Sequence, residues 1–368
     1  MRIAFGADTH VWGLGNIKQS NLISSRKPAA ILLYGDIAVQ DKKTDFGRHR
    51  ADYLQRDFFP AWKRLSASVP VYAVWDDHDY IANDVAGIKG GKFSEEEHRG
   101  LRRIWKENWN NPYYGFGNDD GGIFFRTRIG PIDIIMLDNR FFRNWPTIEE
   151  GNGFLGLAQM AWLEEQLLQC TGAFKIVVCP TMWTDHVTNG KDSWGKLDPK
   201  GREKILKLIE DNNIHGVLLV SGDRHGARAF TIPRVSGFKF YEFEQGSLGG
   251  RGGPPASSNG WADVQLYGIS GRFAFGEFSF DLSLEDPEVH FRSIKDDGEV
   301  IYEITLTQSQ LTPNNLTTGN PTSDSLTTSS PTTSTAAVPT LSDENDDDDD
   351  GDDDGDGDGD GDGDGDGD

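Results

Sequence analysis

The chain has 368 residues, of which 36% are hydrophobic, and its formal net charge is −23 at pH 7. Residues 343–368 hold 16 Asp and one Glu and neither Lys nor Arg, so the rest of the chain carries only about −6. This length allows one large α/β domain with a sizeable core. No basic stripe indicates a nucleic-acid-binding surface, the two cysteines give no disulfide framework, and no apolar run approaches the roughly 20 residues of a membrane span.

Six short apolar runs predict buried strands. Most of them are continuous rather than alternating, which is typical of strands that are covered on both faces. In chain order the runs are Ile3–Phe5, Ala30–Tyr34, Val71–Trp75, Ile132–Leu137, Phe174–Cys179 and Gly216–Val220.

Helical patterns lie between several of these runs. Residues 48–66 mix charged residues with spaced apolar ones, and residues 157–169 place apolar residues on one face. A Ser-x-x-Glu capping box opens residues 94–109, and an Asp-Pro pair supplies an N-cap and a first-turn proline for residues 198–212. This alternation of strands and helices predicts a layered α/β domain.

The pattern changes in the last third of the chain. Residues 245–260 are rich in Gly, Pro and Ser and are read as a long loop. Residues 273–306 alternate apolar and polar residues around an Asp-Asp-Gly turn, which predicts an antiparallel C-terminal ending to the same domain.

Beyond residue 307 the composition is no longer that of a folded domain. Residues 308–342 are mostly Ser, Thr, Pro and Asn and predict a disordered linker, because they bury too little apolar surface to offset the entropy of ordering. Residues 343–368 form an acidic Asp/Gly low-complexity tail, which we expect to attract cations diffusely or to bind a basic partner.

Four acidic or histidine motifs follow predicted strands. In an open α/β sheet ligands bind outside the carboxyl ends of the strands, so these motifs are expected to meet at one edge. Converging carboxylates repel each other and are costly to bury unless cations hold them, and two metal ions roughly 3.5–4 Å apart suit phosphoryl transfer. The motifs are Asp8-Thr9-His10, Gly35-Asp36, Asp76-Asp77-His78-Asp79 and Asp223-Arg224-His225.

Each motif also has a simpler interpretation. An isolated Asp-x-His is usually a loop pair or a helix cap, and an isolated Gly-Asp after a strand is usually a turn. Residues 76–79 fit this interpretation poorly, because three acids around one histidine would destabilise a strand end without a counter-charge. All four motifs in order therefore favour a metal site.

In these residues the chain resembles the calcineurin-like metallophosphoesterase superfamily, and within it the PhoD-like alkaline phosphatase branch. The resemblance covers about residues 1–307 and implies a four-layer α/β-β/α sandwich. It implies an enzyme that hydrolyses phosphate ester bonds in a small molecule, as a phosphatase or phosphodiesterase, through in-line attack by a metal-bound hydroxide. The matching motifs are Trp75-Asp76-Asp77-His78-Asp79, Leu137-Asp138-Asn139-Arg140 and Gly222-Asp223-Arg224-His225.

The resemblance also implies a role for each matched residue. His78 would protonate the leaving alkoxide or steady the phosphate, with Asp79 orienting its ring. Arg140, in the matched Leu-Asp-x-Arg motif, could bind the substrate phosphate as a bidentate fork. Two divalent or trivalent ions are implied as cofactors, with Fe, Mn, Zn and Ca as candidates. Their ligands would be Asp8, His10, Asp36 and His225 for the first ion, and Asp36, Asp77 and Asp223 for the second.

Two departures from the branch concern the metals. Asp8 and Val39 stand where the branch often has Cys and Tyr, and His10 restores the Asp-x-His pattern of the wider superfamily. The single His of that superfamily would follow the strand that ends at Cys179, where the nearest imidazole is His186, read here as an ordinary loop histidine. The second metal is therefore expected to be held more weakly than the first.

Several alternatives stay open. Arg140 could form a salt bridge with a site carboxylate instead, Arg224 is expected to point away from the site, and the substrate could be a monoester or a diester. Outside enzymes, the alternative is a catalytically retired domain that binds cations or a partner through its acidic tail. The lack of an evident signal peptide favours a cytoplasmic location, whereas the Ser/Thr/Pro-rich stretch is compatible with an extracellular one.

Overall fold

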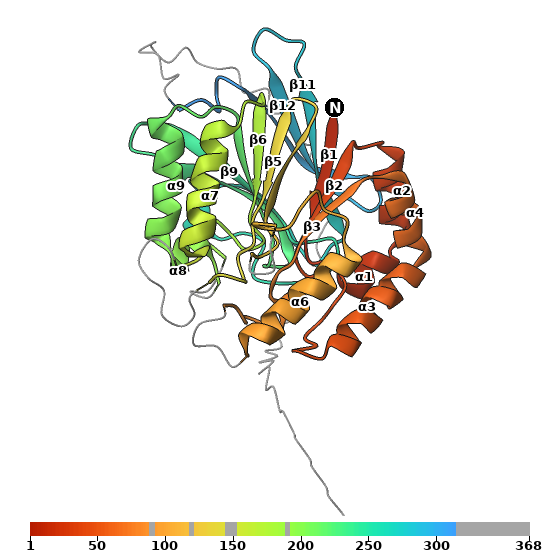
Figure 1. Ribbon diagram of the computed structural model, residues 1–368. Coiled ribbons are helices and arrows are strands. Elements are labelled where there is room, and N and C mark those ends of the chain that lie inside the picture. Colours follow the sequence, from red (N-terminus) through yellow and green to blue (C-terminus); the bar gives the residue numbers. More distant parts are fainter. Residues whose placement is uncertain (88–92, 118–120, 144–152, 188–191, 314–368) are drawn as a thin grey trace, which may run out of the picture. The chain divides into compact units, whose positions relative to one another are not determined.

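Two mixed sheets lie at the centre of the folded unit, with helices on their outer sides (Figure 1). The linker and tail expected beyond residue 307 lie outside the described residues from residue 314 onward. The computed structural model describes residues 1–87, 93–117, 121–143, 153–187 and 192–313.

The first sheet joins the beginning of the chain to its last described strands. β1, β2 and β3 pair in parallel, and the other edge of β1 pairs antiparallel with β11, which continues into β12 and β13. The antiparallel ending predicted for residues 273–306 is therefore confirmed. In spatial order the strands are β13 (Val300–Thr307), β12 (Glu288–Lys295), β11 (Ala274–Asp281), β1 (Arg2–Gly6), β2 (Ala30–Tyr34) and β3 (Val71–Val74).

The second sheet has a parallel centre and antiparallel edges. β5, β6, β7 and β9 run parallel, while β4, β8 and β10 pair antiparallel with their neighbours. In spatial order the strands are β10 (Gln265–Ser270), β8 (Gly226–Pro233), β9 (Lys239–Gln245), β7 (Val217–Ser221), β6 (Phe174–Val178), β5 (Ile132–Met136) and β4 (Phe125–Ile129).

Helices cover the outer face of each sheet. Figure 1 shows α2 and α4 beside the first sheet and α7 and α9 beside the second, so the expected four-layer α/β-β/α sandwich is confirmed. The helices are α1 (His10–Gly15), α2 (Ile17–Ser25), α3 (Phe46–Phe58), α4 (Pro60–Ser68), α5 (Asp77–Tyr80), α6 (Glu95–Asn108), α7 (Gly156–Gln169), α8 (Trp194–Leu197) and α9 (Pro199–Asp211), with a short 3₁₀ turn at Asn259–Trp261.

All six predicted strands are present, as β1, β2, β3, β5, β6 and β7. Their continuous apolar character has a direct cause, because alternate residues enter two different cores. In β6, Ile176 packs in the core between the sheets, whereas Val177 packs in the core beneath α7 and α9. The two sheets meet through aromatic rings, for example Phe243 of the second sheet against Phe291 of the first, with ring centroids 4.3 Å apart.

The pattern over residues 48–66 is divided between two helices rather than forming one. Pro60 occupies the first turn of α4, and Phe59 before it is extended, with φ −65° and ψ 121°. A residue that precedes proline is driven out of the helical region, so α3 ends there. The apolar residues Leu54 and Phe58 are 60% and 68% exposed, so this part of the expected apolar face is not buried.

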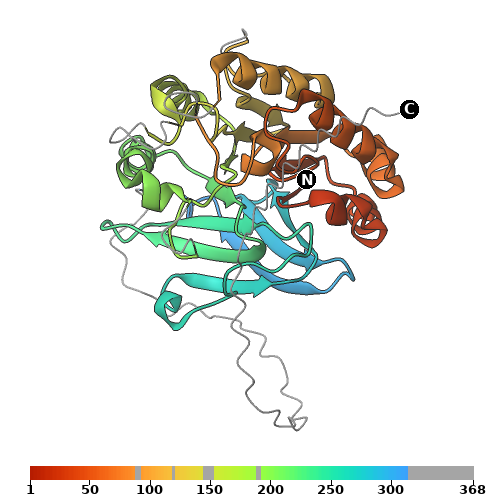
Figure 2. The ribbon, with the colours of Figure 1, turned by 90° about the horizontal axis from the view of Figure 1, so that it is seen from below.

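The carboxyl ends of β1, β2 and β3 define one edge of the molecule. The N-terminus lies at the top of β1 in Figure 1, so these strands end at the lower edge, which faces the reader in Figure 2.

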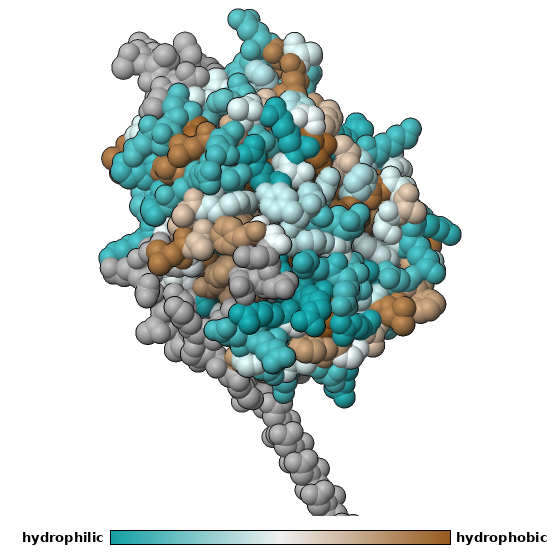
Figure 3. Space-filling model, viewed as in Figure 1, coloured by the Kyte–Doolittle hydropathy of each residue, from teal (hydrophilic) through white to brown (hydrophobic). Residues whose placement is uncertain are grey.

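The face shown in Figure 3 is mainly hydrophilic, with scattered hydrophobic residues. Among the described helices, none combines the length and apolarity that crossing a membrane requires.

Candidate metal centre

The four strand-end motifs meet at this lower edge. Asp8 follows β1, Asp36 follows β2, Asp77 follows β3 and Asp223 follows β7, so both sheets contribute. The parallel pairing of β1 with β2 and of β2 with β3 brings the first three motifs side by side.

One group of four residues is arranged like a complete ligand set. Asp8, His10, Asp36 and His225 each offer a ligand atom, and these four atoms lie within 4.8 Å of one another. Asp8, His10 and Asp36 are each at most 2% exposed. These are the four residues expected for the first metal, and the structure brings them together.

Two further groups continue from the first. Ligand atoms of Asp36, Asp77 and His78 lie within 4.8 Å of one another, and so do those of Asp76, Asp77 and Asp223. Asp36 and Asp77 therefore connect all three groups. The three second-metal candidates lie in this region, together with Asp76, which sequence reasoning left without a role although it belongs to the same acidic run.

The backbone at these residues is unusual. Five of the candidate ligands are non-glycine residues with positive φ, a conformation that costs about 1–3 kcal/mol each. Gly35 before Asp36 also has positive φ, 101°, and a Cβ there would lie only 2.4 Å from Cβ of Asp76. The five φ values are 54° for Asp8, 45° for His10, 52° for Asp36, 73° for Asp223 and 43° for His225.

The crowded carboxylates resist ionisation. Burial, reinforced by neighbouring carboxylates, raises the pKa of Asp8, Asp36 and Asp223 well above the usual value. Burial also raises the pKa of Asp76, to about 6, against the opposing effect of Arg140. For Asp77 burial acts in the same direction, but Arg140 and His78 outweigh it and the pKa is lowered.

The site fits metal ions by two further observations. Burial lowers the pKa of His10 to about 3 and that of His225 to about 4, so both imidazoles are neutral at pH 7 and have a lone pair to offer. Both ring nitrogens of His10, and Oδ2 of Asp76, are buried without a hydrogen-bond partner among the described residues. Metal coordination would satisfy such groups and offset the clustered negative charge.

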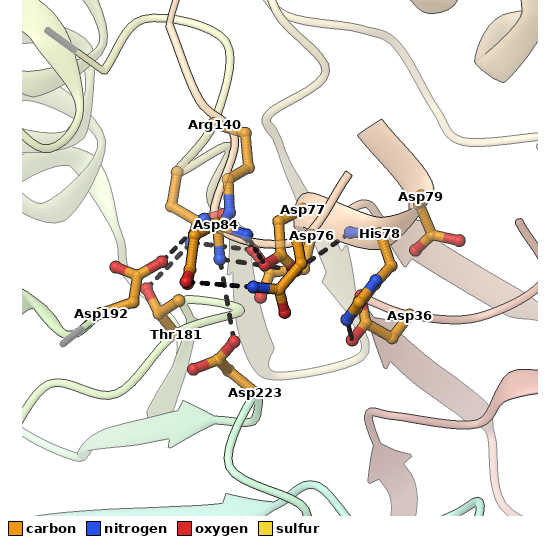
Figure 4. A network of polar contacts seen from close by, with 12 residues as sticks. Asp36, Asp76, Asp77, His78, Asp79, Asp84, Arg140, Thr181, Asp192 and Asp223 are labelled. Atoms are coloured by element: carbon orange, nitrogen blue, oxygen red, sulfur yellow. Dashed lines mark hydrogen bonds and ion pairs between the residues drawn. The ribbon is translucent and has the colours of Figure 1, made fainter. Parts of the chain in front are cut away.

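His78 is held by Asp41 rather than by Asp79. Its Nδ1 lies 2.7 Å from Oδ1 of Asp41, and its Nε2 lies 3.9 Å from Oδ2 of Asp36. Figure 4 shows the His78 ring pointing toward Asp36. Burial lowers the pKa of His78, but the contact with Asp41 and the charge of Asp77 outweigh it and raise the pKa to about 9.

The expectation that Asp79 orients the His78 ring is corrected by its contacts. The backbone N–H groups of Ile37, Ala38 and Val39 donate to the Asp79 carboxylate over 3.0 to 3.4 Å. Asp79 therefore fixes the turn that follows Asp36 and acts on the ligand loop rather than on the ring. This role of Asp79 could not be predicted from the sequence, because the donors are main-chain groups about forty residues away.

The expected role of Arg140 in substrate binding is also corrected. Its side chain is 0% exposed and lies among carboxylates (Figure 4): Nε donates to Asp76, and Nη1 lies 2.7 Å from Oδ2 of Asp192. Nη2 lies 3.7 Å from Asp77 and 3.8 Å from Asp223. The salt-bridge alternative thus describes Arg140, because the buried carboxylates need its charge.

The loop histidine does not join the candidate ligands. His186 lies against Phe230, with ring centroids 5.0 Å apart, and it belongs to none of the groups described above. This agrees with its reading as an ordinary loop histidine. Within the described residues, the second group therefore has no imidazole from this loop.

A cavity of about 130 Å³ opens over the centre. It is large enough for water or a phosphoryl group and lies next to members of all three groups. Its lining residues are Asp36, His78, Asn83, Asp84, Asp223, Arg224, His225 and Pro254.

Comparison with known proteins gives three results. A family model described as "PhoD-like phosphatase" matches residues 32–312. The fold is similar to a structure titled "Structure of PhoD", with TM-score 0.61 and 16% identity over 83% of this chain and 72% of that one. It is also similar to purple acid phosphatase PPD1 from yellow lupin (Lupinus luteus) seeds, with TM-score 0.59 and 13% identity over 83% and 53%. No curated protein matches the chain.

Proposed function

Since this chain belongs to the PhoD-like phosphatase family and is a hydrolase of phosphate esters, we propose that its catalysis depends on two metal ions at the carboxyl edge of the sheets. Asp8, His10, Asp36 and His225 would hold the first ion. Asp36, Asp77 and Asp223 would hold the second, with Asp76 as a further candidate.

The observation that supports this proposal most directly is the shared position of Asp36. Its carboxylate lies with the first group and also with Asp77, which in turn lies with Asp76 and Asp223, so Asp36 stands where a bridging ligand would stand. When bound, the ions would activate the attacking water and offset the charge that develops on the phosphoryl oxygens.

His78 would supply the proton that the leaving alkoxide needs. It lines the cavity with a side chain 12% exposed, and its Nε2 faces the metal centre while Asp41 holds Nδ1. Its pKa of about 9 keeps the ring protonated at neutral pH, as a general acid must be. Asp41 replaces Asp79 as the residue that orients the ring.

Metal analysis combined with kinetics tests the proposal. We expect the purified chain to contain close to two ions and to hydrolyse aryl phosphate with added Mn²⁺, Fe²⁺/³⁺, Zn²⁺ or Ca²⁺. Asp36→Asn should lower both the metal content and the rate, the latter by about a hundredfold or more. Asp211→Asn, at an exposed position on α9, is the matched control and should change neither.

Two results would sink the proposal. One is the absence of hydrolysis of both aryl phosphate and bis-aryl phosphate with every metal, and the other is full activity of Asp36→Asn. The ratio of the two substrate rates would also separate a monoesterase from a diesterase. The retired-enzyme alternative depends on the acidic tail, which lies outside the described residues, and no described feature favours it.

A further inference from the structure

Arg140 is buried against carboxylates, so any basic side chain that contacts the phosphoryl group beside the metal ions has to be another one. A phosphate monoester carries up to two negative charges, and it would approach an edge lined by carboxylates. Two other arginines are candidates: Arg224 lines the cavity over the centre, and Arg251 belongs to a loop whose glycines approach Asp8 and His225. Arg224 precedes His225 in the sequence, and Arg251 lies two residues before Gly253, which approaches His225.

Arg224 lines the cavity over the candidate metal centre, together with Asp36, His78 and His225. The expectation that it points away from the site is therefore corrected. Its side chain is 16% exposed, and Nη1 lies 3.5 Å from Oδ2 of Asp223, which is a loose contact for an ion pair. Its Nε is buried without a hydrogen-bond partner among the described residues.

Arg251 lies on a glycine-rich loop that touches the candidate ligands directly. A Cβ on Gly249 would lie 2.4 Å from the carbonyl oxygen of Asp8, and one on Gly253 would lie 2.7 Å from Cβ of His225. Only glycine lets the loop approach this closely. Arg251 stands between these contacts and is the one charged residue from position 246 to 262.

The Arg251 side chain is available for a ligand. The residue is exposed, and it makes no hydrogen bond or ion pair among the described residues. Among the described residues, no carboxylate therefore neutralises this guanidinium.

A buried ion pair joins the two arginine-bearing segments. Arg228 on β8 and Glu244 on β9 are both 0% exposed and lie 2.7 Å apart. Arg228 also donates to the carbonyl oxygens of Arg224, over 3.1 Å, and of Pro254, over 2.6 Å. The turn that carries Arg224 and the loop that carries Arg251 are therefore held by one side chain.

We propose that Arg224 and Arg251 together bind the phosphoryl group of the substrate at the mouth of the metal centre. The proposal rests on the metal-dependent hydrolysis proposed above and adds the residues that recognise the substrate. Each guanidinium can donate two parallel N–H groups to phosphate oxygens, a geometry that lysine cannot reproduce. In this arrangement Arg140 neutralises buried carboxylates, whereas Arg224 and Arg251 bind the substrate.

Binding of inorganic phosphate to the metal-loaded full-length chain tests this without turnover. Titration calorimetry should show phosphate affinity weakened about tenfold or more in Arg224→Gln and in Arg251→Gln. The KM for aryl phosphate should rise similarly in Arg251→Gln, with metal content unchanged. Arg251→Lys should recover only part of the affinity. Arg48→Gln, whose side chain is 75% exposed on α3, is the matched control.

The outcomes separate this inference from the proposed function. Unchanged phosphate affinity in Arg251→Gln overturns the inference while wild-type hydrolysis leaves the metal centre standing. A wild-type chain that takes up no metal and hydrolyses no ester overturns both. Arg224→Gln could lose metal because Arg224 lies between two candidate ligands, Asp223 and His225. In that case the phosphate affinity of Arg251→Gln tests the inference, because Arg251 is adjacent to no candidate ligand in the sequence.

Discussion

At the scale of single residues, the contacts of His78 determine how its proton can be used. Asp41 holds Nδ1 at 2.7 Å, and this contact is the largest influence that raises the pKa of the ring against burial. A protonated ring is the active form of a general acid, so activity on the basic side should fall as the pH passes the pKa of His78.

Asp41→Asn should therefore shift the basic limb of the kcat/KM profile to lower pH, by about one pH unit or more. Removing the charge weakens the preference for the protonated ring, so the acid form is lost earlier as the pH rises. A pH–rate profile with aryl phosphate measures this shift. A profile that coincides with those of the wild type and Asp211→Asn would show that Asp41 does not tune His78.

The clustered carboxylates make metal-free stability depend on pH. Their pKa values are higher in the folded chain than in the unfolded one, where they lie near 4, and the value for Asp79 reaches about 7. The folded, metal-free chain thus binds more protons, so its stability falls as the pH rises from about 4 to about 7. Asp77, whose pKa is lowered, opposes this trend but is outnumbered.

Bound metal should remove most of this penalty, because it replaces the protons as the counter-charge. The difference in melting temperature between metal-loaded and chelated protein is expected to grow from pH 5 to pH 8. Thermal denaturation at both pH values, with and without chelator, measures it. A difference that is constant or shrinks would mean that these carboxylates do not hold the ions.

At the scale of elements, α6 shows how local sequence sets a helix boundary. The Ser94 hydroxyl accepts a hydrogen bond from the backbone N–H of Glu97, and the Glu97 carboxylate accepts one from the backbone N–H of Ser94. This capping box was predictable from four residues because both partners are local. Ser94→Ala should lower the free energy of unfolding by about 1 kcal/mol.

Chemical denaturation measures this change. Ser68→Ala, at the end of α4, is the control, because its hydroxyl donates within the helix to Arg64 and caps no helix start. An equal loss of stability in both variants would show that the capping box contributes nothing beyond an ordinary serine.

Elements whose signals are local or apolar could be predicted from the sequence, and the others could not. The six apolar runs all correspond to strands, and the ligand candidates were visible because they follow these runs. β8 and β9 were missed because Arg228, Glu242 and Glu244 interrupt their apolar pattern, although all three are buried. The partners of Asp79 and Arg140 were likewise invisible, since burial and tertiary neighbours alone decide which charges meet.

At the scale of the whole molecule, the folded part extends past the expected boundary at residue 307. Leu311 is 1% exposed, and its carbonyl oxygen accepts from the N–H of Gly216 over 2.9 Å. Gln308 donates to the carbonyl oxygen of Ala173 over 2.8 Å. These contacts attach the segment after β13 to the second sheet, so the folded domain includes Gln308 and Leu311.

Two truncations test this boundary. A chain that ends at Pro313 should keep its melting temperature and its hydrolysis of aryl phosphate. A chain that ends at Thr307 loses the buried Leu311 side chain and should be less stable by about 2–5 kcal/mol. Thermal denaturation and kinetics of both chains provide the comparison. Equal stability of the two would return the boundary to residue 307, and inactivity of the longer chain would give the tail a role in catalysis.

The left-handed backbone at the five candidate ligands sets stability and function against each other. Glycine at any of these positions would relieve steric strain, so a chain freed from the need to bind metal would gain stability by accepting it. The chain instead has aspartate or histidine at all five positions. Glycine substitutions at these positions would therefore raise the stability of the chain but remove its metal ligands and with them its activity.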